Sequence, residues 1–272
     1  MAEVTCPGLP ASWLNAWLAA VGATVLDSRI RLHWTTERTP VAVLSADGAD
    51  PVETLADSWP TTGVLDAMPI AEHWGDTPSL PRKVHVDAFI QRARATRGHL
   101  YSWTLSSTMT DLHLEKSGEV AHGPFDPPAP KGATMQSRLL RVHDRVEPSV
   151  ERFMDSFAGR AVRVEGNGLG FDLTRLGSQS DVSRTAVDPV IEVLAFFGLA
   201  LLPVRGEGTD FRLASKSRSS MIQRGWRRVP GGAREHRFMW PAWAPALDHA
   251  AIDAILDAWK PDKRVWPQLA QV

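Results

Sequence analysis

Hydrophobic positions recur along this chain with two different periods, which predicts a mixture of helices and strands. In "LPASWLNAWLAAVG" (residues 9–22) the apolar residues follow helical spacing, and Gly22 is expected to end the helix. The next runs, "TVLDSRIRLHW" and "TPVAVLSA", alternate as strands do. Asp50 and Pro51 predict the start of a short helix through Ser58. This order is typical of a compact α+β unit.

The rest of the chain continues the mixture. Residues 60–83 and 121–132 are rich in loop-forming residues, and the stretch between them opens with an amphipathic helical pattern over Val84–Arg97. Helices are predicted over 134–146 and 148–157, and "RAVRVEGNGLGFDL" (160–173) predicts a hairpin that turns on its glycines. "FRLAS", "MIQRGWRRV" and "EHRFMWP" predict a small antiparallel sheet, and "LDHAAIDAILDAW" predicts a final helix.

The segment "VDPVIEVLAFFGLALLP" predicts a central buried helix near 189–198. Asp188 suits the N-cap, Pro189 suits the first helical position, and Gly198 suits the end. The segment is apolar nearly all round, which is typical of a helix that is covered on every side. The expected fold class is therefore α+β, with mixed helices and small antiparallel sheets.

Charge divides the chain into two parts. Residues 1–80 hold ten acidic and three basic residues, whereas the remainder carries a surplus of six positive charges, so that the net charge is −1. We therefore expect an acidic N-terminal α+β unit over 1–80 and a basic α+β region over 81–272. The alternative is one continuous domain that includes both.

Composition is that of a soluble globular protein. The 272 residues are 43% hydrophobic and 22% charged, and no apolar run is long enough to span a bilayer. The N-terminus lacks the pattern of a signal peptide, and it is expected to be loose. The single cysteine, Cys6, excludes an intramolecular disulfide framework. These features predict a cytoplasmic protein with no membrane partner.

Candidate catalytic residues are sparse. The doublet His143-Asp144 is the type that metal-dependent phosphohydrolases use to hold metals, with His122 and Asp188 as available further ligands. A solvated helix face is the favoured interpretation of the doublet, because two-residue motifs arise often by chance. "GNGLG" (166–170) lacks the further residues of a nucleotide-binding motif and favours a turn. No cofactor or metal is predicted, and a non-catalytic role is favoured over an enzyme.

A basic segment over 205–237 gives a stronger signal. It holds nine basic and three acidic residues, and tryptophan interleaves with arginine in "RGWRR". Arginine pairs with phosphate in a bidentate manner, and tryptophan can stack on a base. The alternative is that Trp226 packs in the core and the arginines only improve solubility. The predicted nucleic-acid-binding residues are Arg205, Lys216, Arg218, Arg224, Trp226, Arg227, Arg228 and Arg234.

The stretch "FMWPAWAPAL" (238–247) follows this basic segment directly. It is either the end of a core strand or an aromatic platform beside a basic surface. We favour the structural interpretation, because large aromatic side chains usually lie in cores. Trp240 is then buried at the end of a strand, and Pro241 and Pro245 turn the chain towards the last helix.

Three stretches together resemble the large-subunit-like proteins of type I-G (formerly I-U) CRISPR-Cas systems. They are "GLPASWLNAWLAAVGATVL…IRLHWTTERTPVAVL", "VDPVIEVLAFFGLALLPV" and "FMWPAWAPAL", in the order expected, although Ala246 intervenes before Leu247 in the last. The chain is much shorter than a full large subunit, so it resembles an accessory or reduced subunit.

The resemblance implies a non-catalytic subunit of an RNA-guided DNA surveillance complex in antiviral defence. In such complexes base pairing reads the sequence, and the protein grips the backbone. The implied partners are other CRISPR effector subunits and guide RNA or target DNA, and the nuclease is another polypeptide. Two alternatives stay open: a phosphohydrolase that uses His143 and Asp144, and a purely structural protein whose tryptophans line a partner interface.

Overall fold

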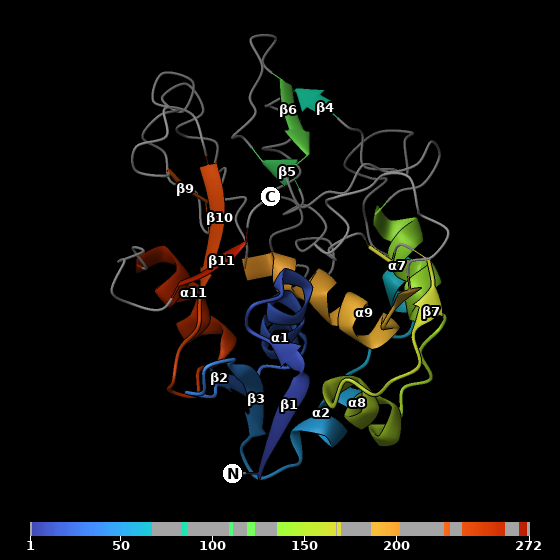
Figure 1. Ribbon diagram of the computed structural model, residues 1–272. Helices are drawn as coiled ribbons and strands as arrows, with labels where there is room; N and C mark the ends of the chain where they lie inside the picture. The colour runs from blue at the N-terminus through green and yellow to red at the C-terminus, as the bar shows by residue number, and fades with distance from the viewer. Residues whose placement is uncertain are drawn as a thin grey trace.

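A computed structural model of the protein has an α+β fold in which helices pack against small antiparallel sheets (Figure 1). The structure describes residues 2–66, 135–166, 168–169, 186–201 and 236–258. It also describes the backbone of short strands at 83–85, 109–110, 119–122, 226–228 and 267–270.

The N-terminal sheet has three strands in the order β1-β3-β2. Strand β1 (Ala2–Pro10) and β2 (Ile30–Trp34) both pair antiparallel with β3 (Val41–Ala46), which places Leu44 between Val4 and Leu32. The two strands predicted over 24–46 are thus confirmed at their cores. Strand β1 was not expected, because its proline and glycine content indicates a loop. Pairing with β3 orders this segment.

Cys6 shows that the N-terminus is part of the core, which corrects the expectation of a loose end. It lies in β1 and is fully buried. Burial raises the pKa of the Cys6 thiol to about 12, since a thiolate is poorly solvated there. The side chain therefore behaves as a small apolar residue.

Helix α1 (Leu14–Leu26) lies against the sheet and contains the predicted apolar stripe. It starts later and ends later than predicted, and Gly22 lies inside it. The prediction that Gly22 ends the helix is wrong, and the reason is packing. A Cβ atom at Gly22 would overlap the carbonyl oxygen of Leu194 in helix α9 (Pro189–Gly198).

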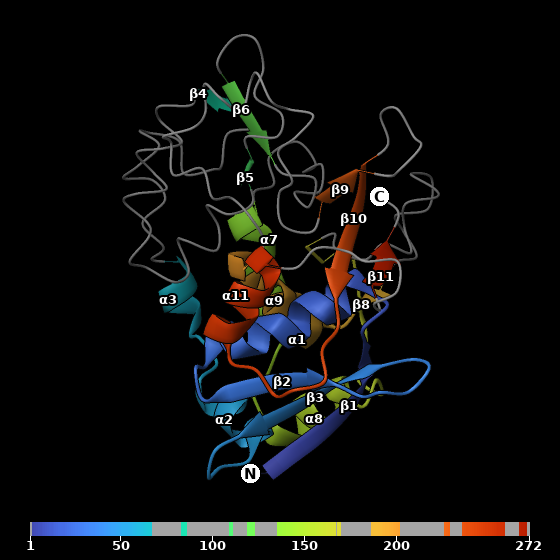
Figure 2. The same ribbon diagram turned by 90° about the vertical axis from the view of Figure 1, so that its left-hand side faces the viewer.

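The contact between α1 and α9 organises the core, and Figures 1 and 2 show the two helices side by side. Gly198 mirrors Gly22, because a Cβ atom there would overlap the carbonyl oxygen of Leu18. Two glycines thus let the two backbones approach closely. Glycine is otherwise unfavourable inside a helix, but Gly22 is required here because any side chain would keep the two helices apart.

Helix α9 confirms the predicted central buried helix. All of its residues are buried, Pro189 opens it, and the Asp188 carboxylate accepts a hydrogen bond from Val190 N as its cap. A short 3-10 helix, η4 (Leu199–Leu201), continues beyond Gly198. Burial on every side explains the nearly all-apolar sequence.

Further helices of the described part of the chain pack on this pair, on the sheet or on one another. Helix α2 (Pro51–Asp57) has Asp50 as its cap, as predicted, and α8 (Val150–Phe157) is capped by Ser149. Helix α7 (Met135–His143) packs against α9 and against α3 (Thr62–Asp66). Helix α3 lies where the sequence predicts a loop, so that part of the prediction is wrong.

Two small sheets also differ from the expectation. Strands β4 (Lys83–His85) and β5 (Met109–Thr110) both pair with β6 (Glu119–His122), so Val84 and His85 are not helical and residues 121–122 are not loop. Strand β7 (Val164–Glu165) pairs with β8 (Ala186–Val187), which is distant in sequence. Gly168 and Leu169 form a turn after β7, but β7 pairs with β8 and not within the predicted hairpin segment 160–173.

The C-terminal sheet has the order β11-β10-β9. Strand β10 (His236–Pro241) pairs with β9 (Trp226–Arg228), as predicted, and with β11 (Pro267–Ala270), which was not predicted. Helix α11 (His249–Ala258) confirms the last predicted helix but is followed by β11. The predicted strand "FRLAS" lies outside the described residues.

Three tryptophans join the C-terminal segment to the N-terminal unit, and we call them the tryptophan seam: Trp17, Trp240 and Trp243. Their indole N–H groups donate to the carbonyl oxygens of Pro241 (2.9 Å), Ala11 (2.6 Å) and Leu32 (2.8 Å), respectively. Residues 243–247 also bond to the free edge of β2, through Trp34 N to Trp243 O and a Leu32–Leu247 bridge. The structural interpretation of "FMWPAWAPAL" is thereby confirmed.

One hydrophobic core includes residues from both sides of position 80. Trp17 and Leu44 from the acidic part, and Phe196 and Trp240 from the basic part, belong to the same buried cluster. Within the described part of the chain, no helix combines the length and apolar character that a bilayer crossing requires.

Candidate nucleic-acid interface

The predicted basic site lies only partly within the described residues. Trp226, Arg227 and Arg228 form strand β9, opposite Phe238, Arg237 and His236 of β10. The remaining predicted contacts lie outside the described residues: Arg205, Lys216, Arg218, Arg224 and Arg234. Their role therefore stays a prediction.

His143 and Asp144 lie at the C-terminal end of α7, and His143 is buried rather than on a solvated face. Its ring stacks on Trp59 at a centroid distance of 5.8 Å, and its Nε2 lies 2.6 Å from the carbonyl oxygen of Pro60. Because a carbonyl only accepts hydrogen bonds, Nε2 carries the proton. Its Nδ1 lies 3.4 Å from Thr62 Oγ1. These contacts hold the ring in place as a packing residue.

The other two residues proposed as metal ligands lie in other elements of the fold. Asp188 caps α9, and His122 lies in β6. Among the described residues, no three His, Cys, Asp or Glu side chains come together in a way that could hold a metal ion. The contacts of His143 thus give the phosphohydrolase alternative no support.

A second basic site, which the sequence did not single out, lies along α7. Arg138 and Arg141 belong to the helix, and Arg145 follows in the turn after it. The spacing i, i+3, i+7 places all three on one side of the helix, while Leu139 and Val142 face the core. This spacing could have indicated a basic helix face from the sequence alone. Three arginines on one helix are, however, also typical of an ordinary solvent-exposed face.

The three arginines line one pocket of about 340 Å³, which we call the arginine pocket. Its other walls come from Val142 and from the β7–β8 ribbon with its glycine turn (Figure 1 shows α7 beside β7). The full set of lining residues is Arg138, Arg141, Val142, Arg145, Val164, Glu165, Gly166, Gly168 and Val187. Its single carboxylate is Glu165, so the formal charge of the lining is positive.

Electrostatics set this pocket apart. Arg138 is only 7% exposed, and burial together with the charge of Arg141 lowers the pKa of its guanidinium. Arg141 donates from Nε to Ser137 O at 3.2 Å, which leaves its terminal nitrogens available. Among the described residues, neither Arg141 nor Arg145 forms an ion pair with a carboxylate. The positive charges of Arg141 and Arg145, which are close to that of Arg138, favour the binding of an anion.

The glycine turn after β7 forms a fixed wall of the pocket. Gly166 and Gly168 have φ values of 129° and 49°, which side-chain-bearing residues rarely adopt. The Glu192 carboxylate of α9 accepts a hydrogen bond from Leu169 N at 2.5 Å, and a Cβ atom at Gly168 would overlap that carboxylate. The turn is therefore bonded to α9, all of whose residues are buried, which preorganises the wall.

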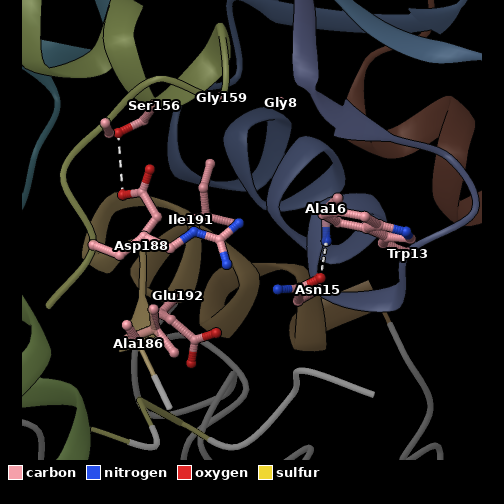
Figure 3. A pocket seen from close by; sticks show the side chains of 13 residues that line it. Gly8, Trp13, Asn15, Ala16, Ser156, Gly159, Ala186, Asp188, Ile191 and Glu192 are labelled. Atoms are coloured by element: carbon pink, nitrogen blue, oxygen red, sulfur yellow. Dashed lines mark hydrogen bonds between the residues drawn. The ribbon is translucent and has the colours of Figure 1, made fainter. Parts of the chain in front are cut away.

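A second pocket, of about 90 Å³, lies near the N-terminus of α9 (Figure 3). It is lined by Trp13, Asn15, Ser156, Asp188 and Glu192, among others. The Asp188 carboxylate accepts hydrogen bonds from Ser156 Oγ (3.1 Å) and Arg152 (3.2 Å), and Asn15 Oδ1 accepts one from Ala16 N. Burial raises the pKa of Asp188 although these donors oppose the shift. The polar groups of this pocket thus form hydrogen bonds with one another and with the backbone at the ends of the neighbouring helices.

No protein-family model, curated protein or solved structure matches this chain at a significant level. Of the two pockets, the arginine pocket is the candidate functional site, because Arg141 and Arg145 have no carboxylate partner among the described residues.

Proposed function

We propose that the chain is a non-catalytic nucleic-acid-binding or assembly subunit of an RNA-guided CRISPR surveillance complex that acts in the cytoplasm in antiviral defence. The observation that carries the nucleic-acid part of this proposal is the arginine pocket. Three guanidinium groups line it, and those of Arg141 and Arg145 form no ion pair with a carboxylate within the described part of the chain. Guanidinium is the side-chain group best suited to bind phosphate.

Two features of the sequence support the proposal. The positive surplus lies in the part of the chain that holds both the arginine pocket and the basic segment 205–237. The three stretches that resemble type I-G proteins include the α1 and α9 segments and the tryptophan seam. Because those segments are buried in the core, guide RNA or target DNA would contact the basic surface of other segments.

The test is affinity for single-stranded RNA and double-stranded DNA, measured by fluorescence anisotropy across a series of salt concentrations. Binding is expected to weaken steeply with salt, because each phosphate contact releases counterions. The double variant Arg141→Gln/Arg145→Gln is expected to lower the slope for a single strand by about 1.4, from two lost contacts of about 0.7 each.

The control is a variant that also loses two positive charges, but outside the arginine pocket. Arg38 and Arg160 are exposed and do not line the arginine pocket, so Arg38→Gln/Arg160→Gln should leave the slope nearly unchanged. An absence of binding at low salt would overturn the nucleic-acid part of the proposal and would favour a protein-docking role.

A further inference from the structure

The shape of the arginine pocket restricts what it can hold. Its volume of about 340 Å³ is at the lower end of the range for small-molecule sites, which run from about 300 to 1,000 Å³. A double helix carries its phosphates on the outside of a wide cylinder and holds each nucleotide by pairing and stacking. Extruding one nucleotide from a duplex costs a few kcal/mol, whereas an unpaired nucleotide enters a pocket without that cost.

The lining of the pocket matches the parts of one nucleotide. Arg138, Arg141 and Arg145 supply the phosphate-binding groups. Val142 and Val187 are both nearly buried, and with the half-buried Val164 they supply an apolar surface for a sugar or base. Glu165 is a hydrogen-bond acceptor, which suits an amino or hydroxyl group and would repel a bare phosphate.

The pocket is also held in a fixed form. Helix α7 packs on α9, and the glycine turn on the opposite wall is bonded to Glu192 of the same helix. Both walls thus rest on the buried centre of the core. Preorganisation of this kind raises affinity, because little conformational entropy is lost on binding.

We propose that the arginine pocket binds one unpaired nucleotide of a single strand, with the phosphate among Arg138, Arg141 and Arg145 and the sugar or base against the valines. This inference rests on the proposed function and adds the ligand class of the same site. A surface that only attracted phosphates would treat single strands and duplexes alike, apart from charge density.

The first experiment fills the pocket without changing its charge. Val164→Phe places a larger side chain at the lining, and Val162→Phe is the control, because Val162 lies two residues away in the same segment and is 80% exposed. Val164→Phe is expected to weaken single-stranded RNA binding about tenfold, equivalent to about 1.4 kcal/mol, and to leave duplex binding unchanged. Val162→Phe should change neither.

The second experiment needs no variant and therefore does not depend on folding. Adenosine 5′-monophosphate and inorganic phosphate are each titrated into the complex of the full chain with single-stranded RNA at matched ionic strength. The mononucleotide is expected to displace the strand at concentrations at which inorganic phosphate does not.

The outcomes separate the two proposals. Equal loss of single-strand and duplex affinity in a folded Val164→Phe variant, or equal competition by inorganic phosphate, would overturn the nucleotide pocket and leave the nucleic-acid-binding function intact. Displacement of the strand by neither compound would likewise overturn the pocket alone. A protein that binds no nucleic acid at low salt would overturn both.

Discussion

The tryptophan seam and the arginine pocket differ in how their polar groups are satisfied. Each indole N–H of the seam donates to a backbone carbonyl from a distant part of the chain. In the pocket, Arg141 and Arg145 have no carboxylate partner among the described residues. The most conspicuous motif of the sequence thus builds the fold, whereas two less conspicuous arginines carry charge that no carboxylate of the described residues neutralises.

The largest effect is expected at the centre of the seam. Trp240→Ala should lower the free energy of unfolding by about 3–5 kcal/mol, because a fully buried indole and its hydrogen bond to Ala11 O are lost together. Trp240→Phe keeps much of the apolar volume and should lower it by about 2 kcal/mol. Chemical denaturation measures both.

Trp13 is the matched control for this prediction, because it is 50% exposed. Trp13→Ala should change the free energy of unfolding by less than about 0.5 kcal/mol. Similar losses for Trp240→Ala and Trp13→Ala would show that "FMWPAWAPAL" is not structural.

A somewhat smaller effect is expected where α1 crosses α9. Gly22→Ala should lower the free energy of unfolding by about 3 kcal/mol, because the added methyl group overlaps the Leu194 carbonyl oxygen and forces the helices apart. Gly63→Ala in α3 is the matched control, since a Cβ atom there meets nothing within 4 Å. It should be stabilising by up to about 1 kcal/mol. Thermal unfolding of both variants checks the comparison, and a stable Gly22→Ala would contradict the close crossing.

The smallest effect on stability is expected in the arginine pocket. Arg141→Gln/Arg145→Gln should leave the free energy of unfolding unchanged or raise it by up to about 0.5 kcal/mol, because repulsion of Arg138 is reduced. Denaturation at low salt, where charge effects are largest, is the measurement. A loss greater than about 1 kcal/mol would mean that these arginines hold the fold together, and the contrast with the seam would disappear.

Much of the fold could be predicted from local sequence. Helix α9 is encoded by its cap, its proline and its apolar composition, and β2 and β3 by their alternation. Strand β1 and helix α3 were missed, because Pro7 and Gly8, or the "PTTG" stretch, favour loops when taken alone. Long-range pairing and packing override weak local preferences.

The site was less predictable than the fold. The sequence drew attention to 205–237, which remains a predicted basic surface, and to His143, which packs on Trp59. It did not indicate that Arg138, Arg141 and Arg145 face the glycine turn after β7. That juxtaposition depends on β7 pairing with β8 and on the bond from Leu169 N to Glu192.

The sequence by itself determined the α+β class, the caps of α2 and α9, the buried central helix and the separation of charge between the two parts of the chain. Each of these depends on residues close together in the sequence or on composition alone. Only the tertiary structure decided that Gly22 lies at a helix crossing instead of a helix end, that the tryptophans join the two ends of the chain, and that three arginines share one pocket. These features depend on contacts between distant residues, whose geometry no local pattern encodes.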